Sequence, residues 1–167
     1  HDQMLIMDYN RVVRDLNGLT PDQLVAAVEK HFELSPAPDP RPTAPHTFGM
    51  YLDGRWTRLV ARPRVVPEGD PVGSLDVAVL QDSLLAPILG IGDPRSDERV
   101  DFVGGIRGLG ELERLVDSGR YAVAFALHPT SIEQLFAVAD AGEVMPPKST
   151  WFEPKLRSGL IIRPLSE

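Results

Sequence analysis

Positively charged side chains and hydroxyl groups gather in one proline-bounded segment near the carboxyl terminus. Residues 145–159 read MPPKSTWFEPKLRSG and contain three cations, three hydroxyl-bearing side chains and two aromatic rings. The side chains best suited to contact a phosphate group are Lys148, Ser149, Thr150, Lys155 and Arg157. Such a segment can shape a pocket for an anionic ligand, because Lys and Arg form charge-assisted hydrogen bonds with phosphate oxygens. The alternative is a solvated basic loop that its two aromatic side chains anchor.

A glycine-rich turn is the second candidate anion site. Residues 103–111 read VGGIRGLGE, and we expect them to join a strand to a helix. Free backbone N–H groups at such a junction attract anions, and an arginine can add a bidentate contact. We therefore predict phosphate contacts from Gly104, Gly105 and Arg107. A tight turn that needs small residues would explain the glycines equally well.

Neither segment completes a known nucleotide-binding motif. Gly108 and Gly110 lack the third glycine of the G-x-G-x-x-G fingerprint. Residues 142–149 come close to the P-loop pattern, but Pro147 stands where that pattern requires glycine, and proline has no N–H to donate to a phosphate. The sequence also lacks the G-x-S-x-G motif of serine hydrolases.

Candidate catalytic and metal-binding side chains are few. Asp101 lies within a predicted strand and is a weak candidate for a catalytic base, either in water or held by a partner such as Arg107. The four histidines show none of the spacings typical of metal sites, so we predict no metal ligands. His128 follows a predicted buried strand, and we favour a structural role for it. The catalytic residues are left unassigned.

Composition narrows the class of protein. The chain has 167 residues, which suits one domain, and its lack of cysteine excludes disulfides and thiol chemistry and favours a reducing compartment, the cytoplasm. A formal charge of -7 argues against a general nucleic-acid surface. Its longest apolar stretches are far shorter than a membrane span. A small-molecule substrate is the remaining partner that we expect outside the polypeptide.

Strand and helix patterns alternate along the chain and must position these side chains. We expect strands near residues 3–8, 48–52, 56–61, 99–103, 121–127 and 159–163, and helices near residues 21–32, 75–85, 110–116 and 131–139. A two-residue turn at Asp53-Gly54 predicts a β-hairpin. The pattern predicts an α/β protein of mixed α+β type, in which helices flank a mixed sheet. Residues 35–45 are rich in proline and should form an extended connector within a single domain of residues 1–167.

Local signals also predict how individual helices begin and pack. Thr20 with Gln23 forms a capping box. Ser74 should cap the second helix, and Thr130 with Glu133 should cap the last one. On the last helix, we expect an apolar stripe to pack into the core. It consists of Ile132, Leu135, Phe136 and Ala139.

Four stretches of the sequence together resemble one family. They cover residues 1–13, 74–91, 101–105 and 145–160, and the family is the domain of unknown function numbered 1015 (DUF 1015). The chain looks like the carboxy-terminal half of such a protein. The family's upstream half carries an Asp-Gly-His-His-Arg motif similar to one in ParB/sulfiredoxin-like proteins, a group that includes kinases acting on free serine. That motif is absent from this sequence.

The resemblance implies an activity and the parts needed for it. It implies ATP-dependent phosphorylation of a small hydroxylated metabolite such as L-serine, with ATP and Mg²⁺ as cofactors and the missing amino-terminal half of the polypeptide as a partner. In this hypothesis Arg107 and Lys148 hold phosphate, and Ser149 or Thr150 provides a hydroxyl contact. A second hypothesis is a non-catalytic module that binds a phosphorylated metabolite or a partner chain. A third is a purely structural half.

Overall fold

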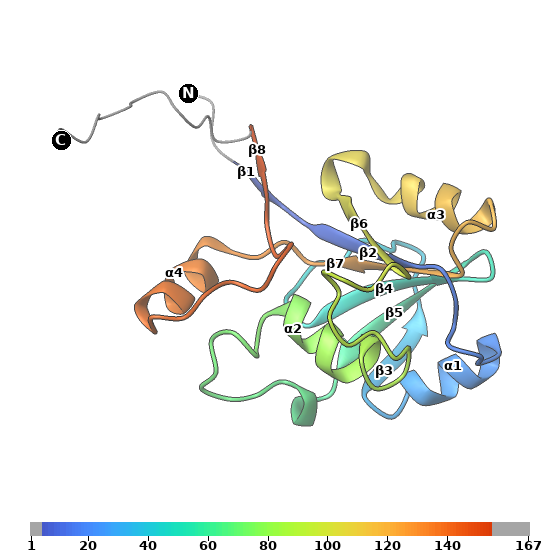
Figure 1. The fold of residues 1–167 in the computed structure, drawn as a ribbon, viewed down its shortest axis with the longest axis horizontal. Coiled ribbons are helices and arrows are strands. Elements are labelled where there is room, and N and C mark those ends of the chain that lie inside the picture. Colours follow the sequence, from blue (N-terminus) through green and yellow to red (C-terminus); the bar gives the residue numbers. More distant parts are fainter. Residues whose placement is uncertain (1–4, 155–167) are drawn as a thin grey trace.

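An antiparallel sheet of six strands forms the centre of the molecule in a computed structural model that describes residues 5–154 (Figure 1). The strands are β2 (Tyr9–Val13), β3 (Phe32–Pro36), β4 (Thr47–Leu52), β5 (Arg55–Ala61), β6 (Val100–Gly104) and β7 (Val123–Leu127). Their order is β3-β5-β4-β7-β2-β6. The mixed α+β class and the hairpin at Asp53-Gly54 are confirmed.

The strand directions differ from the mixed sheet expected from the alternating pattern, because every pair within the described sheet is antiparallel. The reason lies in one insertion. Strands β6 and β7 both run antiparallel to β2 and are therefore parallel to each other, with helix α3 (Leu109–Asp117) connecting them. Strand β2 lies between them, so the two parallel strands never become neighbours.

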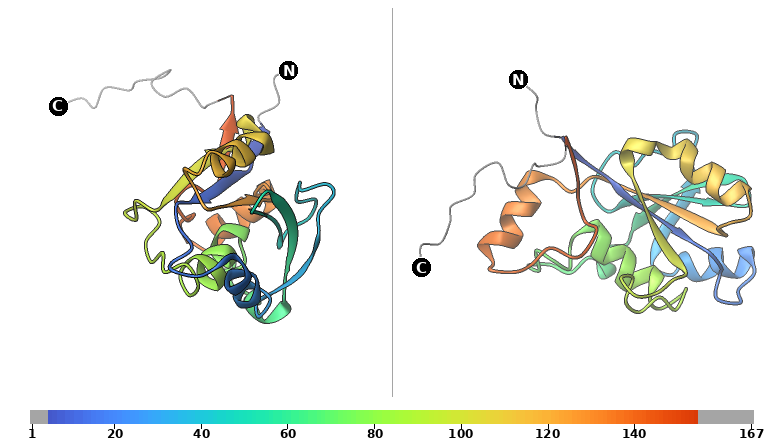
Figure 2. Two further views of the ribbon diagram at one scale, coloured as in Figure 1. Left: turned by 90° about the vertical axis from the view of Figure 1, so that its right-hand side faces the viewer. Right: turned by 45° about the horizontal axis from the view of Figure 1, so that its top comes forward.

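Helices cover both faces of this sheet (Figure 2). Helices α1 (Pro21–Val28) and α2 (Asp76–Leu80), with the π-helical turn η2 (Gln81–Leu85), pack on the face that carries Val13. Helix α3 packs on the face that carries Val12. Since neighbouring residues of a strand point to opposite faces, β2 sends alternate side chains into two separate cores.

A second, smaller sheet and the last helix lie beyond one end of the main sheet (Figure 1). Strand β1 (Leu5–Met7) pairs with β8 (Trp151–Glu153) as an antiparallel ribbon. Helix α4 (Ile132–Asp140) packs into the core through Val138. Two short 3₁₀ turns complete the described elements, η1 (Pro63–Val65) and η3 (Gly105–Arg107).

The predicted apolar stripe of α4 is wrong. Ile132 is 39% exposed and Phe136 is 58% exposed, and Leu135 and Ala139 are also outside the buried core. Only Val138 of this helix is buried. Helical periodicity identifies a stripe but not the direction from which the rest of the protein approaches, and here the core lies against a different side of the helix.

The helix starts follow local chemistry, with two shifts. The capping box of α1 is confirmed, since the N–H of Gln23 donates to Thr20 Oγ1 at 3.2 Å. The box of α4 lies one residue later than predicted and uses Ser131 with Gln134. The N-cap of α2 is Leu75 rather than Ser74, and no side chain caps it.

Three other boundaries differ from the sequence prediction or lie outside the structure. Phe32 begins β3 instead of ending α1, and β3 reaches Pro36, so the loop of the proline-rich connector starts later than residue 35. The strand expected at residues 159–163 lies outside the described residues.

Within residues 5–154, no helix combines the length and the apolar character needed to cross a membrane.

Candidate anion-binding site

A buried arginine on β2 is the chemically most unusual side chain of the structure. Arg11 is 4% exposed, and it lies on the sheet face that α2 covers because Val13 of the same strand points into that core. Its register partner on β6 is Phe102, and the guanidinium carbon lies 4.7 Å from the centre of that ring. Stacking on an aromatic ring holds the guanidinium plane but leaves its N–H groups free to donate.

The charge of Arg11 has no counter-charge among the described residues. Its Nη1 donates to the carbonyl oxygen of Tyr9, and its Nη2 donates to the carbonyl oxygen of Lys148 at 3.0 Å. These two bonds use two of the five N–H donors of a guanidinium. Burial lowers the pKa of Arg11 to about 9, so the side chain is still a cation at neutral pH. An uncompensated buried cation favours the binding of an anion.

Arg11 lines a cavity of about 620 Å³ between the sheet, α2 and the loop before β8. Gln81 and Arg95 also line this cavity, together with the proline-rich residues 145–147. The Oε1 atom of Gln81 is buried and accepts no hydrogen bond from the described residues. Asp82 and Asp93 line the cavity too, but neither forms an ion pair with Arg11. Asp93 instead forms an ion pair with Arg95, with 3.1 Å between Oδ2 and Nη2. The cavity therefore has in its wall a buried cation without a counter-charge.

The carboxy-terminal segment closes this site mainly through its backbone. Lys148 takes a positive φ of 57°, which turns its carbonyl toward Arg11, while its Nζ lies 5.7 Å from the centre of the Tyr9 ring. The hydroxyl of Ser149 donates to the carbonyl of Pro146, and the Ser149 carbonyl accepts from Thr130 Oγ1 at 3.1 Å. Ser149 is buried and occupied in this way, so the predicted phosphate contact of its hydroxyl gains no support from the structure.

The glycine pair meets the same segment, for reasons of packing. A Cβ atom on Gly104 would lie 2.6 Å from the Trp151 ring, and one on Gly105 would overlap the carboxylate of Asp8. The N–H of Gly105 donates to the carbonyl of Asp8 at 2.8 Å. The two glycines therefore permit close approach of other residues, which matches the alternative given for them from the sequence.

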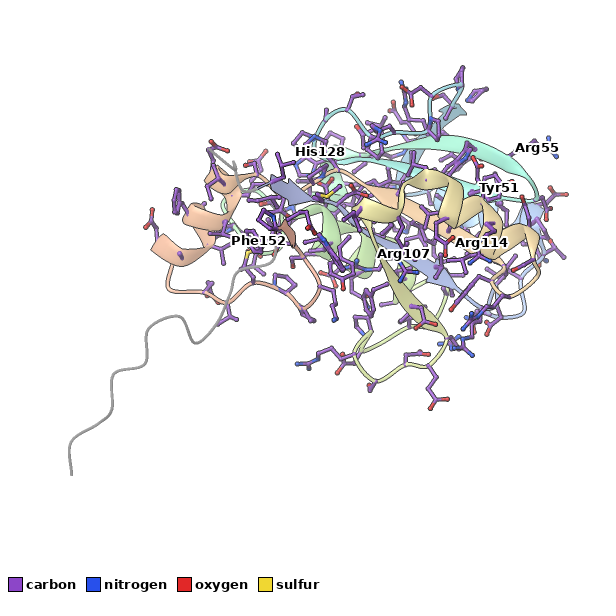
Figure 3. All side chains as sticks on the ribbon, turned by 90° about the horizontal axis from the view of Figure 1, so that it is seen from above. Tyr51, Arg55, Arg107, Arg114, His128 and Phe152 are labelled. Atoms are coloured by element: carbon purple, nitrogen blue, oxygen red, sulfur yellow. The ribbon has the colours of Figure 1, made fainter. Side chains whose placement is uncertain are left out.

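Arg107 and Asp101 lie away from the Arg11 cavity. Arg107 belongs to η3 beside the start of α3, and its side chain is 67% exposed. Its Nη1 lies 3.8 Å from Oε1 of Glu111. His128 lies elsewhere, directly after the end of β7 (Figure 3). Asp101 accepts from the Tyr121 hydroxyl at 2.6 Å and from Arg14 at 3.3 Å, and not from Arg107. Neither residue lines the cavity that contains Arg11.

The remaining predicted site residues can be placed only in part. Thr150 is half-buried beside Trp151, whereas Lys155 and Arg157 lie outside the described residues. The sequence reasoning missed Arg11. Its signal was present, because a cation inside an apolar strand, next to the pair Val12-Val13, is expensive to bury unless it has a role.

Metal-binding groups are not gathered anywhere in residues 5–154. No set of three or more His, Asp or Glu side chains there could hold a metal ion.

Comparison with known proteins supports the resemblance seen in the sequence. Residues 1–78 match the model of a family described as "Protein of unknown function (DUF1015)". This match contains β2 and reaches into α2, the two elements that face each other across the Arg11 cavity. No curated protein sequence matches the chain.

Solved structures share the fold at low sequence identity. A free serine kinase variant in complex with AMP aligns with a TM-score of 0.54 and 12% identity, over 90% of this chain and 55% of its own. The free serine kinase in complex with AMP gives 0.51 and 14%, over 90% and 54%. A conserved hypothetical protein from Pyrococcus furiosus gives 0.54 and 11%, over 91% and 57%. The chain thus spans about half the length of these structures.

Proposed function

We propose that this chain provides the phosphate-binding part of a small-molecule phosphotransferase, with Arg11 as the group that holds the phosphate. The observation that carries the proposal is the buried guanidinium without a counter-charge at the wall of a cavity of about 620 Å³. Phosphoryl transfer depends mainly on positioning and on cations that stabilise the phosphate oxygens. Arg11 replaces Arg107 as the leading phosphate ligand, because Arg107 is exposed and faces Glu111.

The comparisons support the same class of ligand. Two of the similar structures are free serine kinases with bound AMP, and a nucleotide presents a phosphate group. Arg11 would suit the phosphate. ATP as phosphate donor and a small hydroxylated metabolite such as L-serine as acceptor are therefore part of the proposal.

Titration calorimetry on the 167-residue chain tests the phosphate site directly. We expect AMP, ATP or inorganic phosphate to bind, and Arg11→Met to weaken binding by about tenfold or more, since a hydrogen bond to a charged group contributes about 1.5–3 kcal/mol. Arg11→Lys should retain part of the affinity through its charge. Arg64→Met is the matched control, because Arg64 is an exposed arginine that does not line the Arg11 cavity. Equal affinity in Arg11→Met and Arg64→Met would refute the proposal.

Turnover is tested separately, because the chain spans only about half of its structural neighbours. We propose that a further part of the polypeptide supplies the catalytic groups and that the protein works in the cytoplasm. A protein that carries both parts should consume ATP when given L-serine. ATP binding without consumption, across a panel of hydroxylated metabolites, would favour the non-catalytic binding module instead.

A further inference from the structure

Strand β6 is an open edge of the main sheet. It is the last strand in the order, with β2 on one side and no described strand on the other. The edge strand at the other end, β3, finishes at Pro36, which has no backbone N–H to donate to a further strand. Strand β6 contains neither proline nor lysine, residues that commonly protect an edge from pairing. Of these two edges, the one formed by β6 is therefore better suited to accept another strand.

The pairing of β6 with β2 shows which backbone groups of β6 face outward. The N–H of Gly105 donates to the carbonyl oxygen of Asp8 on the β2 side at 2.8 Å. Because successive residues of an antiparallel strand direct their N–H and C=O groups to alternate sides, those of Val100, Phe102 and Gly104 point away from β2. Within residues 5–154, the outward groups of Phe102 and Gly104 have no backbone partner. An edge of this kind pairs with a second extended chain.

A cavity of about 420 Å³ borders this edge, and an available negative charge lies at its amino-terminal end. The loop before β6 contributes Asp97 and Glu98 to the cavity wall. Asp97 is already paired with Arg99 at 2.8 Å. Arg14 and Asp101, which also line the cavity, pair with each other at 3.3 Å. Glu98 is exposed and makes no ion pair or hydrogen bond with any described residue, so its charge is free for a partner.

The carboxyl-terminal end of β6 carries a positive charge and an apolar side chain. Arg107 follows the strand in η3, and its side chain is 67% exposed and makes no hydrogen bond to the rest of residues 5–154. Glu111 lies 3.8 Å from Arg107 but forms a closer pair with Arg114, at 2.8 Å. Ile106, next to Arg107, is 53% exposed. The edge therefore has an acid before its first residue and a cation after its last.

We propose that the β6 edge binds the same edge of a second copy of this chain, as an antiparallel pair about a two-fold axis at Phe102. In this register the two Phe102 residues exchange backbone hydrogen bonds. The N–H of Gly104 donates to the carbonyl oxygen of the partner's Val100, and the same bond recurs on the other side of the axis. The outward groups that lack a partner in the single chain are satisfied in this way.

The arrangement of charge is the reason for choosing a second copy as the occupant. A two-fold axis brings each end of one edge to the opposite end of the other, so Glu98 faces the partner's Arg107 twice in the pair. A peptide with one sign of charge would match only one end. The register also keeps Asp101 opposite the partner's Val103, whereas an axis at Asp101 would place two carboxylates opposite each other. Neither Glu98 nor Arg107 lines the Arg11 cavity, so this proposal is independent of the phosphate site.

Sedimentation equilibrium of the 167-residue chain tests the association. We expect a reversible monomer–dimer equilibrium that weakens at high salt, because the ion pairs are exposed. Glu98→Arg and Arg107→Glu should each weaken dimerisation by about tenfold, since the two-fold axis makes each change act twice. The double variant exchanges the two charges and should regain most of the lost affinity, and Arg64→Glu, at an exposed site elsewhere, should dimerise like the wild type. A chain that stays monomeric at every concentration, or a double variant no tighter than the single ones, would overturn the proposal.

Amide hydrogen exchange identifies the surface that pairs. The N–H groups of Phe102 and Gly104 should exchange at least about tenfold more slowly when the dimer dominates than when the monomer dominates. The N–H of Leu34 is the matched control, because it faces away from β5 on the other edge of the sheet and should exchange at the same rate in both. A dimer in which Phe102 and Gly104 exchange as fast as in the monomer would assign the contact to another surface and refute the β6 edge.

Discussion

The guanidinium of Arg11 and the carbonyl oxygen of Lys148 form a hydrogen bond of 3.0 Å that joins β2 to the segment before β8. These residues are 137 positions apart in the sequence. The bond places the basic, proline-bounded segment beside the one buried cation of the described strands that has no counter-charge. Lys148 thus contributes a backbone acceptor for Arg11, whereas its side chain was predicted to contact phosphate.

Arg11 should make the folded state depend on its ligand. Replacement of a buried, unpaired charge by an apolar residue of similar size is often neutral or stabilising. We therefore expect Arg11→Met to melt within a few degrees of the wild type in the absence of phosphate. Saturating phosphate should raise the melting temperature of the wild type but not of Arg11→Met, because only the wild type binds phosphate. A phosphate-induced gain of the same size in both proteins would contradict this expectation.

Gly104 should not tolerate a side chain. The Cβ of Gly104→Ala would lie 2.6 Å from the Trp151 ring, which Tyr9 holds edge-on at 5.5 Å between ring centres. We expect a loss of about 1–3 kcal/mol in the free energy of unfolding, measured by urea denaturation. Gly110→Ala is the matched control, because its Cβ would meet open space within α3. That substitution should stabilise by up to about 1 kcal/mol, and a loss as large as that of Gly104→Ala would contradict the steric argument.

Asp76 should make stability fall as the pH rises. Burial raises the pKa of Asp76 from 3.8 to about 7, against the hydrogen bonds from the backbone N–H groups of His46 and His128. The folded state therefore holds a proton that the unfolded state releases, and this stabilisation is complete below about pH 4 and lost as the pH passes 7. Three units of pKa correspond to no more than about 4 kcal/mol.

The measurement compares urea unfolding of the wild type with that of Asp76→Asn across this pH range. The difference in the free energy of unfolding should shift in favour of the variant as the pH rises. Asp82→Asn serves as control, because Asp82 is exposed on the following helical turn. A difference between wild type and Asp76→Asn that stays constant from about pH 4 to pH 8 would show that Asp76 ionises normally.

Phe136 should contribute little to folding, although its spacing predicts a core residue. It is 58% exposed, whereas Phe125 is fully buried between the layers. We expect Phe136→Ala to change the free energy of unfolding by less than about 0.5 kcal/mol, and Phe125→Ala to cost about 3–5 kcal/mol. Denaturant titration of both variants checks this contrast. A cost above about 2 kcal/mol for Phe136→Ala would mean that α4 packs differently.

The features that the sequence predicted well are those with short-range causes. The Asp53-Gly54 turn and the Thr20 capping box depend only on neighbouring residues, and both are confirmed. The exposed side of α4 could not be predicted, because an apolar stripe does not show which element will cover it. The same limit explains why the prediction of a mixed sheet was wrong. The position of β2 between β6 and β7 depends on contacts between residues far apart in the sequence.

The sequence analysis identified a segment that borders the Arg11 cavity but not Arg11 itself. The segment around Lys148 and the turn at Gly104 do meet, through Trp151. Arg11 was missed because the predicted strand ended at residue 8, whereas β2 spans Tyr9–Val13, and because its burial depends on Phe102 and on residues far along the chain. Arg107 was favoured because glycines surround it, although its charge is met by Glu111 on the next helix.

If Arg11 holds an anion as proposed, its uncompensated charge would also link the lifetime of the protein in a cell to the supply of that anion. Proteases degrade molecules that open transiently, and a bound anion would make opening rarer. When the anion is scarce, a larger fraction of the molecules would be open and removed, so the amount of protein would follow the supply of the compound that it binds.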